Sequence, residues 1–211
     1  SCDASNDSVE YITENKDNDS MYSDSLYISN SRSYGKLTYS ISGLPSGLKA
    51  YYNKNKTSVK IAGFFNNIER GTTATLTGVD EKGTTFTKKL VFYVGSDSEL
   101  VSYSLPARSE LTYKKWDPKD PEQDSSGFNS NRCTARTFGG VAGGSGSYDY
   151  TITVNGKNVN DDDFNNETFA KAGSYTINIA VTDSNNDKLK TSYSAVVNLV
   201  DGVTIRGSVK D

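Results

Sequence analysis

Short runs in which apolar and polar residues alternate recur along the chain. Alternation with a period of two is the pattern of a half-buried β-strand, whose successive side chains point to opposite faces. In the first half it predicts strands over residues 21–29, 36–42, 58–63, 73–79 and 85–94. In the last of these runs Leu90, Phe92 and Val94 share one face. No part of this half has a helical period, so the pattern favours an all-β fold.

The second half repeats this pattern. It predicts strands over residues 147–154, 174–182 and 189–200. Asn155-Gly156 is a strong signal for a tight turn between strands. The last two strands of each half follow one plan: an alternating strand, a polar turn that begins with Asp80 or Asp183, and a second alternating strand. A structural repeat of about 100 residues predicts two tandem Ig-like antiparallel β-sandwiches.

The expected division of the chain follows from this repeat. A polar tether with one edge strand at Val9 to Ile12 precedes the first sandwich, and a tail or further strand follows the second. The ranges are 1–20 for the tether, 21–97 and 98–201 for the sandwiches, and 202–211 for the tail. Within the second sandwich we expect an extended loop over residues 116–133, because this region is rich in proline and charge and exceeds an ordinary loop in length.

A corner of fixed turn residues lies between two strands of the first half. Gly43, Pro45 and Gly47 occur in the stretch SGLPSGL. Proline fixes φ and glycine tolerates positive φ, so this stretch predicts the place where the chain leaves one sheet and crosses to the other. Leu44 and Leu48 would then close the end of the core.

Two resemblances to known families support the sandwich prediction. The stretch LTYSISGLPSGL, residues 37–48, resembles the signature of bacterial Ig and cadherin-like (dystroglycan-type) domains, and this resemblance covers residues 21–94. In the second half, GGSGSYDYTITVNGK and AGSYTINIAVTDSNND are similar to motifs of PKD-type Ig-like domains. Both resemblances imply extracellular modules that space, present or bind, and neither implies catalysis.

The composition excludes several classes of function. The chain has 211 residues, a formal net charge of −3 and no His. Without His there can be no Ser-His-Asp triad and no His-ligated metal site. The mild acidity argues against a nucleic-acid partner, which requires a basic face. No apolar run reaches the length of about 18–20 residues that a membrane-spanning helix needs.

The two cysteines, Cys2 and Cys133, leave three alternatives open. They could form one disulfide, which suits a secreted protein. Cys2 could instead be a lipid anchor, because SCDASNDS looks like the cleavage point and polar tether of a bacterial lipoprotein. This anchor is the one membrane contact that the sequence suggests. In the third alternative both thiols are unpaired.

Acidic residues near the ends of the predicted sandwiches are candidate calcium ligands. They are Glu14, Asp17, Asp19, Asp183 and Asp187. The cadherin-like resemblance implies carboxylates that hold calcium at domain ends and linkers, and Ca²⁺ takes roughly six to eight oxygen ligands. The alternative is that Asp and Asn simply make polar turns. Calcium is the one cofactor suggested.

Aromatic residues in loops and at strand ends are candidate contacts with a partner. Trp116, Tyr51 and Tyr52 are the residues selected, because Tyr and Trp combine a large apolar ring with a polar atom. The alternative for a neighbouring pair is that one ring packs inward, since adjacent residues of a strand face opposite sides. The pair Phe64-Phe65 is open to the same two interpretations.

These features predict a non-enzymatic protein of the cell surface or extracellular space that acts in adhesion, spacing or surface assembly. Its partners would be a protein or a glycan, or a second copy through exposed strand edges. The alternative is a carbohydrate-binding or accessory module of a larger secreted protein. A hydrolase that uses two carboxylates is a third hypothesis, but no spacing in the sequence selects a pair.

Overall fold

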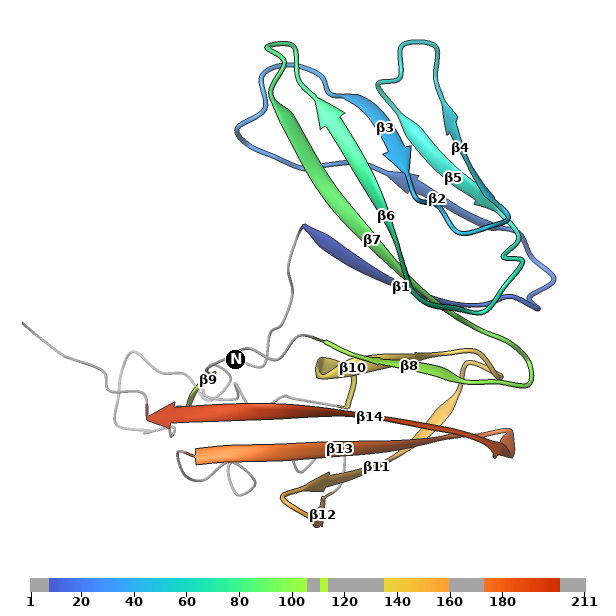
Figure 1. Cartoon of the computed structure of the whole chain (residues 1–211), viewed down its shortest axis with the longest axis vertical. Coiled ribbons are helices and arrows are strands. Elements are labelled where there is room, and N and C mark those ends of the chain that lie inside the picture. The colour runs from blue at the N-terminus through green and yellow to red at the C-terminus, as the bar shows by residue number, and fades with distance from the viewer. Residues whose placement is uncertain (1–7, 106–110, 114–134, 160–172, 202–211) are drawn as a thin grey trace, which may run out of the picture.

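The computed structural model describes residues 8–105, 111–113, 135–159 and 173–201. These residues form two β-sandwiches that follow one another along the chain (Figure 1). None of the helices in the described part of the chain is long and apolar enough to cross a membrane. Trp116, Cys2 and Cys133 lie outside the described residues.

The first sandwich packs a four-stranded sheet on a three-stranded sheet. The larger sheet has the order β1-β7-β6-β3, with β1 (Val9–Asn15), β7 (Thr85–Gly95), β6 (Glu69–Val79) and β3 (Thr38–Ser42). The smaller sheet has the order β2-β5-β4, with β2 (Tyr22–Leu26), β5 (Val59–Gly63) and β4 (Leu48–Tyr52). β1 runs parallel to β7, and the other pairs are antiparallel.

The second sandwich is built from a five-stranded and a two-stranded sheet. The larger sheet has the order β12-β11-β13-β14-β9, with β12 (Lys157–Val159), β11 (Tyr148–Val154), β13 (Gly173–Asp183), β14 (Asn186–Asp201) and β9 (Leu111–Tyr113). The smaller sheet pairs β10 (Gly139–Ala142) with β8 (Val101–Ser104), and a 3-10 turn, η1 (Ala135–Thr137), precedes β10. β9 runs parallel to β14, as β1 does to β7 in the first sandwich.

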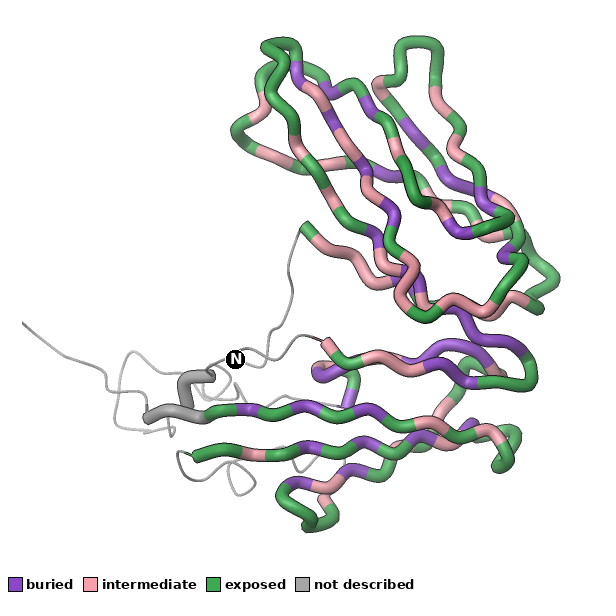
Figure 2. Tube along the Cα trace, in the orientation of Figure 1, coloured by how far each residue is buried: buried purple, intermediate pink, exposed green. Residues whose placement is uncertain are grey.

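Each sandwich has its own apolar core, and the predicted alternation builds it. Leu90 and Phe92 of β7 are fully buried in the first core, and Ile177 and Ile179 of β13 are fully buried in the second. Figure 2 shows buried and more exposed positions alternating along these strands. The two clusters share no residue in the described part of the chain. The predicted all-β fold of two tandem Ig-like sandwiches is confirmed.

The corner after β3 performs the predicted crossing. β3 belongs to the larger sheet of the first sandwich and β4 to the smaller one, so the chain changes sheets between them. Gly43 and Gly47 have φ of 82° and 102°, a region that residues with a Cβ rarely adopt. A Cβ on Gly47 would also lie 1.8 Å from the carbonyl oxygen of Phe64. Leu48 is buried in the core, as expected.

The structure corrects the expected N-terminal tether. Residues 9–15, which lie in the range 1–20, form the full strand β1 and pair with β7 along their whole length. The edge strand expected at Val9 to Ile12 is part of it. The polar composition suggested a tether because β1 lies at the edge of its sheet. Ile12 is its only residue with less than a tenth of its surface exposed. β14 likewise begins at Asn186, before the expected residue 189.

The two sandwiches are set at a steep angle rather than in line. In Figure 1 the long strands β13 and β14 run across the lower end of the first sandwich, with β8 and β10 between them and β7. Contacts from β8 reach both β7 and β6, and β10 contacts β1. Strands β1, β6 and β7 of the first sandwich therefore pack on the small sheet of the second.

Candidate functional site

Three tyrosine rings stack where the two sandwiches meet. Tyr11 lies on β1, Tyr93 on β7 and Tyr103 on β8. The Tyr93 and Tyr103 ring centroids are 4.3 Å apart with 16° between the planes, and those of Tyr11 and Tyr103 are 5.2 Å apart with 6°. Each stacked aromatic pair adds roughly 0.5–1.5 kcal/mol beyond the area it buries. The tyrosine stack thus joins the first sandwich to the second.

Local sequence explains how Tyr103 reaches this position. It is paired across the small sheet with Gly140, and a Cβ there would lie 2.6 Å from the Tyr103 ring. The glycine therefore leaves room for the ring against the backbone of β10. Burial, and then the neighbouring Tyr93 and Tyr11, raise the pKa of Tyr103 to about 12, so its phenol is neutral at physiological pH.

A polar network lies beside the stack, and we call it the junction clasp: Asn15, Asp17, Asp97 and Gly144. The Asn15 side-chain amide donates to Asp97 Oδ1 at 2.8 Å and to the Gly144 carbonyl oxygen at 2.9 Å. The backbone N–H of Asp97 donates to Asp17 Oδ2 at 2.9 Å. One amide thus reaches the segment after β7 and the loop before β11 of the second sandwich.

Charged groups reinforce the clasp at its exposed rim. The N–H of Asp97 and then the ammonium of Lys16, 2.9 Å away, hold the pKa of Asp17 below its ordinary value. Arg70 and Glu99 form a second ion pair at 3.0 Å between β6 and the segment before β8. Both pairs are exposed, and such pairs contribute about 0–1 kcal/mol. The hydrogen bonds of the Asn15 side-chain amide and the stacked rings therefore contribute most to the stability of the junction.

Asp183 has its carboxylate oxygens committed to hydrogen bonds at the same end of the second sandwich. Its Oδ2 accepts from the Ser145 N–H at 2.7 Å, and its Oδ1 accepts from the Ser145 hydroxyl and the Asn185 N–H at 2.9 and 2.8 Å. Burial alone would raise the pKa of Asp183, but these hydrogen bonds outweigh it and hold the pKa below its ordinary value. The carboxylate therefore ties the β13–β14 turn to the loop before β11.

Asp80 performs the same role in the first sandwich. Its Oδ2 accepts from the Tyr34 N–H at 3.0 Å, and its Oδ1 accepts from the N–H groups of Lys82 and Thr84 at 2.9 and 2.8 Å. The Tyr34 N–H, above all, holds the pKa of Asp80 below its ordinary value. The match between Asp80 and Asp183 in the sequence therefore reflects equivalent hydrogen bonding.

The predicted calcium ligands do not assemble into a cation site. Asp17 and Asp183 lie at the junction, but N–H and O–H donors already occupy them, as described above. Glu14 is half-buried on β1, and burial raises its pKa. Asp19 and Asp187 are exposed. Within the described residues no three His, Cys, Asp or Glu side chains are grouped so that they could hold a metal ion. The described residues therefore provide no group of ligands that fits calcium.

A shallow groove of about 600 Å³ lies on the second sandwich, between β8 and the outer face of the large sheet. Its lining consists of hydroxyl, amide, aliphatic and tyrosine side chains: Ser102, Tyr103, Ser104, Thr151, Thr153, Asn178, Ile179, Ala180, Ser192, Tyr193 and Ser194. None of these is a carboxylate. The groove thus lacks the pair of acids that glycoside hydrolysis requires.

The neighbouring tyrosines at the end of β4 face opposite ways. Tyr52 turns inward and its phenolic oxygen accepts a hydrogen bond from the Ile41 N–H at 3.1 Å. Tyr51 is 53% exposed. Phe64 and Phe65 divide in the same way, with Phe64 exposed and Phe65 in the core. Of these two neighbouring pairs, Tyr51 and Phe64 are thus the members exposed to solvent.

Sequence reasoning missed the residues that join the sandwiches. Asn15 and Tyr103 lie outside the predicted strands, and Tyr11 and Tyr93 had no signal beyond their place in predicted strands. Asn15 contacts Gly144 across 129 positions of the chain, and Asp97 across 82. Asp97 lies in the polar segment GSDSE, which marked the boundary between the repeats but not a contact.

Comparison with known proteins gives likenesses of fold only. No protein-family model matches the chain, and no curated protein does. Among solved structures, the cadherin domains 1–5 of protocadherin gamma B2 are 11% identical with a TM-score of 0.34, covering 92% of this chain and 38% of that one. An endo-fucoidan hydrolase of glycoside hydrolase family 107 is 11% identical, with a TM-score of 0.31 and coverages of 92% and 28%.

The Ig1-2 module of a Drosophila receptor protein tyrosine phosphatase, DLAR, is 8% identical, with a TM-score of 0.28, covering 93% of this chain and 94% of that one. The chain thus spans well under half of the protocadherin and hydrolase chains. Overall superposition at these TM-scores supports no inference about function. The assignment of a cadherin- and Ig-like fold is carried by the strand order and by the parallel pairs β1·β7 and β9·β14.

Proposed function

We propose that the chain is a non-enzymatic, extracellular module that holds two Ig-like sandwiches at a fixed angle and serves in adhesion, spacing or surface assembly. The junction is the observation that carries this proposal. The tyrosine stack and the junction clasp connect the two sandwiches through side chains from β1, β7 and β8 and from two loops. A spacer or adhesive module requires such a junction, because a freely hinged pair of domains would not set the direction of presentation.

The sequence resemblances support the same assignment. The corner at residues 37–48 favours a bacterial dystroglycan-type domain for the first sandwich, and the motifs of β11 and β13 favour a PKD-type domain for the second. The domain limits of 21–97 and 98–201 belong to this proposal, with β1 added to the first domain. An anchor at Cys2, or its disulfide with Cys133, would fit an extracellular location equally well.

Distance measurements between spin labels test the rigidity of the junction. Labels at Asn53→Cys, in the β4–β5 hairpin, and Lys157→Cys, on β12, report the relative position of the two sandwiches when Cys2 and Cys133 are replaced by Ser. We expect one narrow distance distribution. A distribution as broad as that of two domains on a free linker would overturn the proposal.

A paired variant identifies the cause of the rigidity. Tyr103→Ala together with Asn15→Ala removes the centre of the stack and the shared amide of the clasp, so the distribution should broaden. Tyr34→Ala is the matched control, since Tyr34 is an exposed tyrosine at the other end of the first sandwich. It should leave the distribution unchanged.

A further inference from the structure

The charge of the chain is distributed unevenly. Residues 25–68 contain no Asp or Glu and six basic residues: Arg32, Lys36, Lys49, Lys54, Lys56 and Lys60. This segment carries +6 in a chain whose formal net charge is −3, so the remaining residues carry −3 − 6 = −9. The segment includes β3, β4 and β5. An otherwise acidic molecule thus has one basic region.

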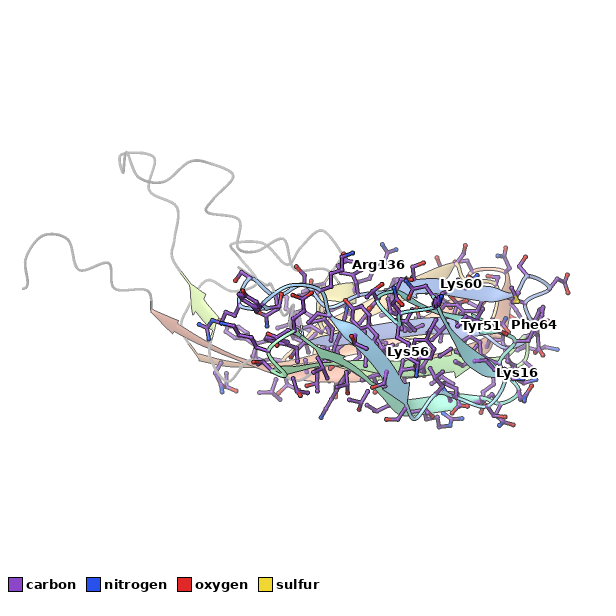
Figure 3. The ribbon with its side chains drawn as sticks, turned by 90° about the horizontal axis from the view of Figure 1, so that it is seen from above. Lys16, Tyr51, Lys56, Lys60, Phe64 and Arg136 are labelled. Atoms are coloured by element: carbon purple, nitrogen blue, oxygen red, sulfur yellow. The ribbon has the colours of Figure 1, made fainter. Side chains whose placement is uncertain are left out.

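The structure places part of this segment on the outer face of the three-stranded sheet β2-β5-β4. Tyr51 on β4 is paired with Lys60 on β5, and Lys49 is paired with Ala62. Met21 directly precedes β2 and Phe64 directly follows β5, and both are exposed. We call Met21, Lys49, Tyr51, Lys60 and Phe64 the basic aromatic face, and Figure 3 shows Tyr51, Lys60 and Phe64 on it, with Lys56 nearby.

The large apolar side chains of this face are unusually exposed. Met21, Tyr51 and Phe64 have 54%, 53% and 51% of their surfaces accessible. They account for half of the large exposed hydrophobic residues found in the described chain. Ala62, which is paired with Lys49, is buried although it belongs to neither core cluster. The face therefore combines exposed apolar side chains with basic ones.

The lysines of the face are available to a ligand. Among the described residues the ion pairs join Lys16 to Asp17, Arg70 to Glu99 and Lys88 to Glu10, and none involves Lys49 or Lys60. The nearest acidic residues in sequence are Asp24 and Glu69, at the two ends of the uncompensated segment. Two free ammonium groups beside exposed rings favour a ligand that is both anionic and partly apolar.

We propose that the basic aromatic face binds a linear polysaccharide that carries carboxylates, that is, a uronate polymer. Tyr51 and Phe64 would stack on the C–H faces of sugar rings, and Lys49 and Lys60 would pair with the carboxylates. Tyr51 is paired with Lys60, and Phe64 follows Lys60 by four residues, just beyond the end of β5. At about 3.3 Å per residue this corresponds to roughly 13 Å, so the two rings would contact different sugars of one chain.

The size of the face favours an extended ligand over a folded protein. Three strands about 4.8 Å apart and five residues long present a footprint on the order of 250 Å². A stable interface between folded proteins buries about 800 Å² on each partner. A chain of sugars that contacts the face along one strip needs no larger area. The low density of positive charge matches about one carboxylate per sugar rather than dense sulfation.

The chemistry of the face also favours a sugar chain over an acidic peptide. An extended peptide needs partners for its backbone N–H and C=O groups and finds them at a strand edge. The face of a sheet offers side chains and no free backbone groups. Sugar hydroxyls that point away from the face remain hydrated, so a polysaccharide loses little by lying there.

Titration calorimetry at low ionic strength with oligogalacturonate of about ten sugars tests this proposal, since binding through two ammonium groups should weaken as salt screens them. We expect Lys49→Glu with Lys60→Glu to lower the association constant at least about tenfold, and Tyr51→Ala about fivefold. Lys89→Glu, an exposed lysine on the opposite sheet, and Tyr34→Ala are the matched controls and should bind as the unaltered chain does. Thermal unfolding of each variant confirms that it folds.

Four results would overturn the inference. The first is that the unaltered chain does not bind oligogalacturonate, and the second is that Lys89→Glu lowers its affinity as much as Lys49→Glu with Lys60→Glu does. The third is that polyglutamate binds equally well and loses affinity in the same variants. The fourth is that heparin binds and oligogalacturonate does not. Neutral dextran should not bind. The inference rests on the proposed function and adds a ligand class to it. Its failure can be distinguished from failure of the proposed function. A chain that binds no glycan but keeps a narrow spin-label distribution would still be a rigid spacer.

Discussion

Asp80 and Asp183 are the polar residues on which both sandwiches depend most directly. Each is almost completely buried, and each accepts an N–H from the residue two positions later and another from a loop on the facing side of the sandwich. A buried carboxylate is tolerated only when donors of this kind surround it. The repeated Asp in the sequence is therefore a structural residue of each final hairpin.

Replacement of Asp183 tests this interpretation. Asp183→Asn keeps the shape of the side chain but turns one acceptor into a donor that faces the Ser145 N–H. We expect the free energy of unfolding to fall by about 1–3 kcal/mol, the cost of leaving a buried hydrogen-bonding group unsatisfied. Urea denaturation measures this change. Asp187→Asn, an exposed residue of the same hairpin, is the control and should change stability little.

The stabilities of the unaltered chain and of Asp183→Asn should depend differently on pH. Because the folded pKa of Asp183 lies below its unfolded value near 4, its contribution is present above about pH 4 and is lost as pH falls through the folded pKa. Glu14, with a raised pKa, acts in the opposite direction. The difference in stability between the unaltered chain and Asp183→Asn should therefore shrink toward pH 2. A pH-independent difference would contradict the role of the charge.

Among the strands, β1 shows how pairing can decide what composition does not. Its residues are mostly polar, yet all seven pair in parallel with β7. Only Ile12 needs a place in the core, and the backbone hydrogen bonds along one edge hold the rest. An edge strand exposed to solvent on one side can therefore carry the composition of a tether.

The β3–β4 corner should be sensitive to a single methyl group. Gly47→Ala meets a positive φ and a backbone oxygen 1.8 Å from the new Cβ, so we expect it to lower stability by about 3 kcal/mol or more. Gly83→Ala is the matched control, because Gly83 also has a positive φ but no atom within 4 Å. It should cost only about 1–2 kcal/mol. Thermal or urea unfolding compares the two, and equal losses would show that the close approach is unimportant.

At the scale of the whole molecule, two kinds of contact join the sandwiches. The tyrosine stack contributes apolar contact, and the junction clasp fixes its orientation through directional hydrogen bonds. At this junction Asp17 and Asp183 accept backbone N–H groups. The contacts of Asn15 across this junction join positions that are 82 and 129 residues apart in the sequence.

Because the described residues hold no group of calcium ligands, we expect calcium to leave the stability of the chain unchanged. A cation bound at about 100 times its dissociation constant would stabilise the fold by about 2.7 kcal/mol, which raises the melting temperature by several degrees. We expect thermal unfolding in calcium and in EDTA to agree within about a degree. A calcium-dependent rise of several degrees would restore Glu14, Asp17 and Asp183 as candidate ligands.

Local patterns were sufficient to predict the type of fold. Alternation of period two located most of the longer strands, because it is set by neighbouring residues that must face opposite sides of a sheet. It did not locate the shorter strands β4, β8, β10 and β12. Gly43, Gly47 and Asn155-Gly156 marked their turns for an equally local reason, the backbone conformations that those residues tolerate. The repeat of Asp80 and Asp183 also followed from the sequence, although their shared hydrogen bonding did not.

The functional surfaces were decided by the tertiary structure. Tyr11, Tyr93 and Tyr103 look like any tyrosines of alternating strands until the small sheet of the second sandwich packs on the first. Tyr51 and Tyr52 could each have faced a partner, and the packing of the core selected Tyr52 for the interior. Acidic residues near domain ends suggested calcium ligands. In the structure some of them accept hydrogen bonds from groups up to 80 positions away along the chain. Contacts between residues so far apart in the sequence depend on how the sheets dock. Local residue types and spacing do not reveal that docking.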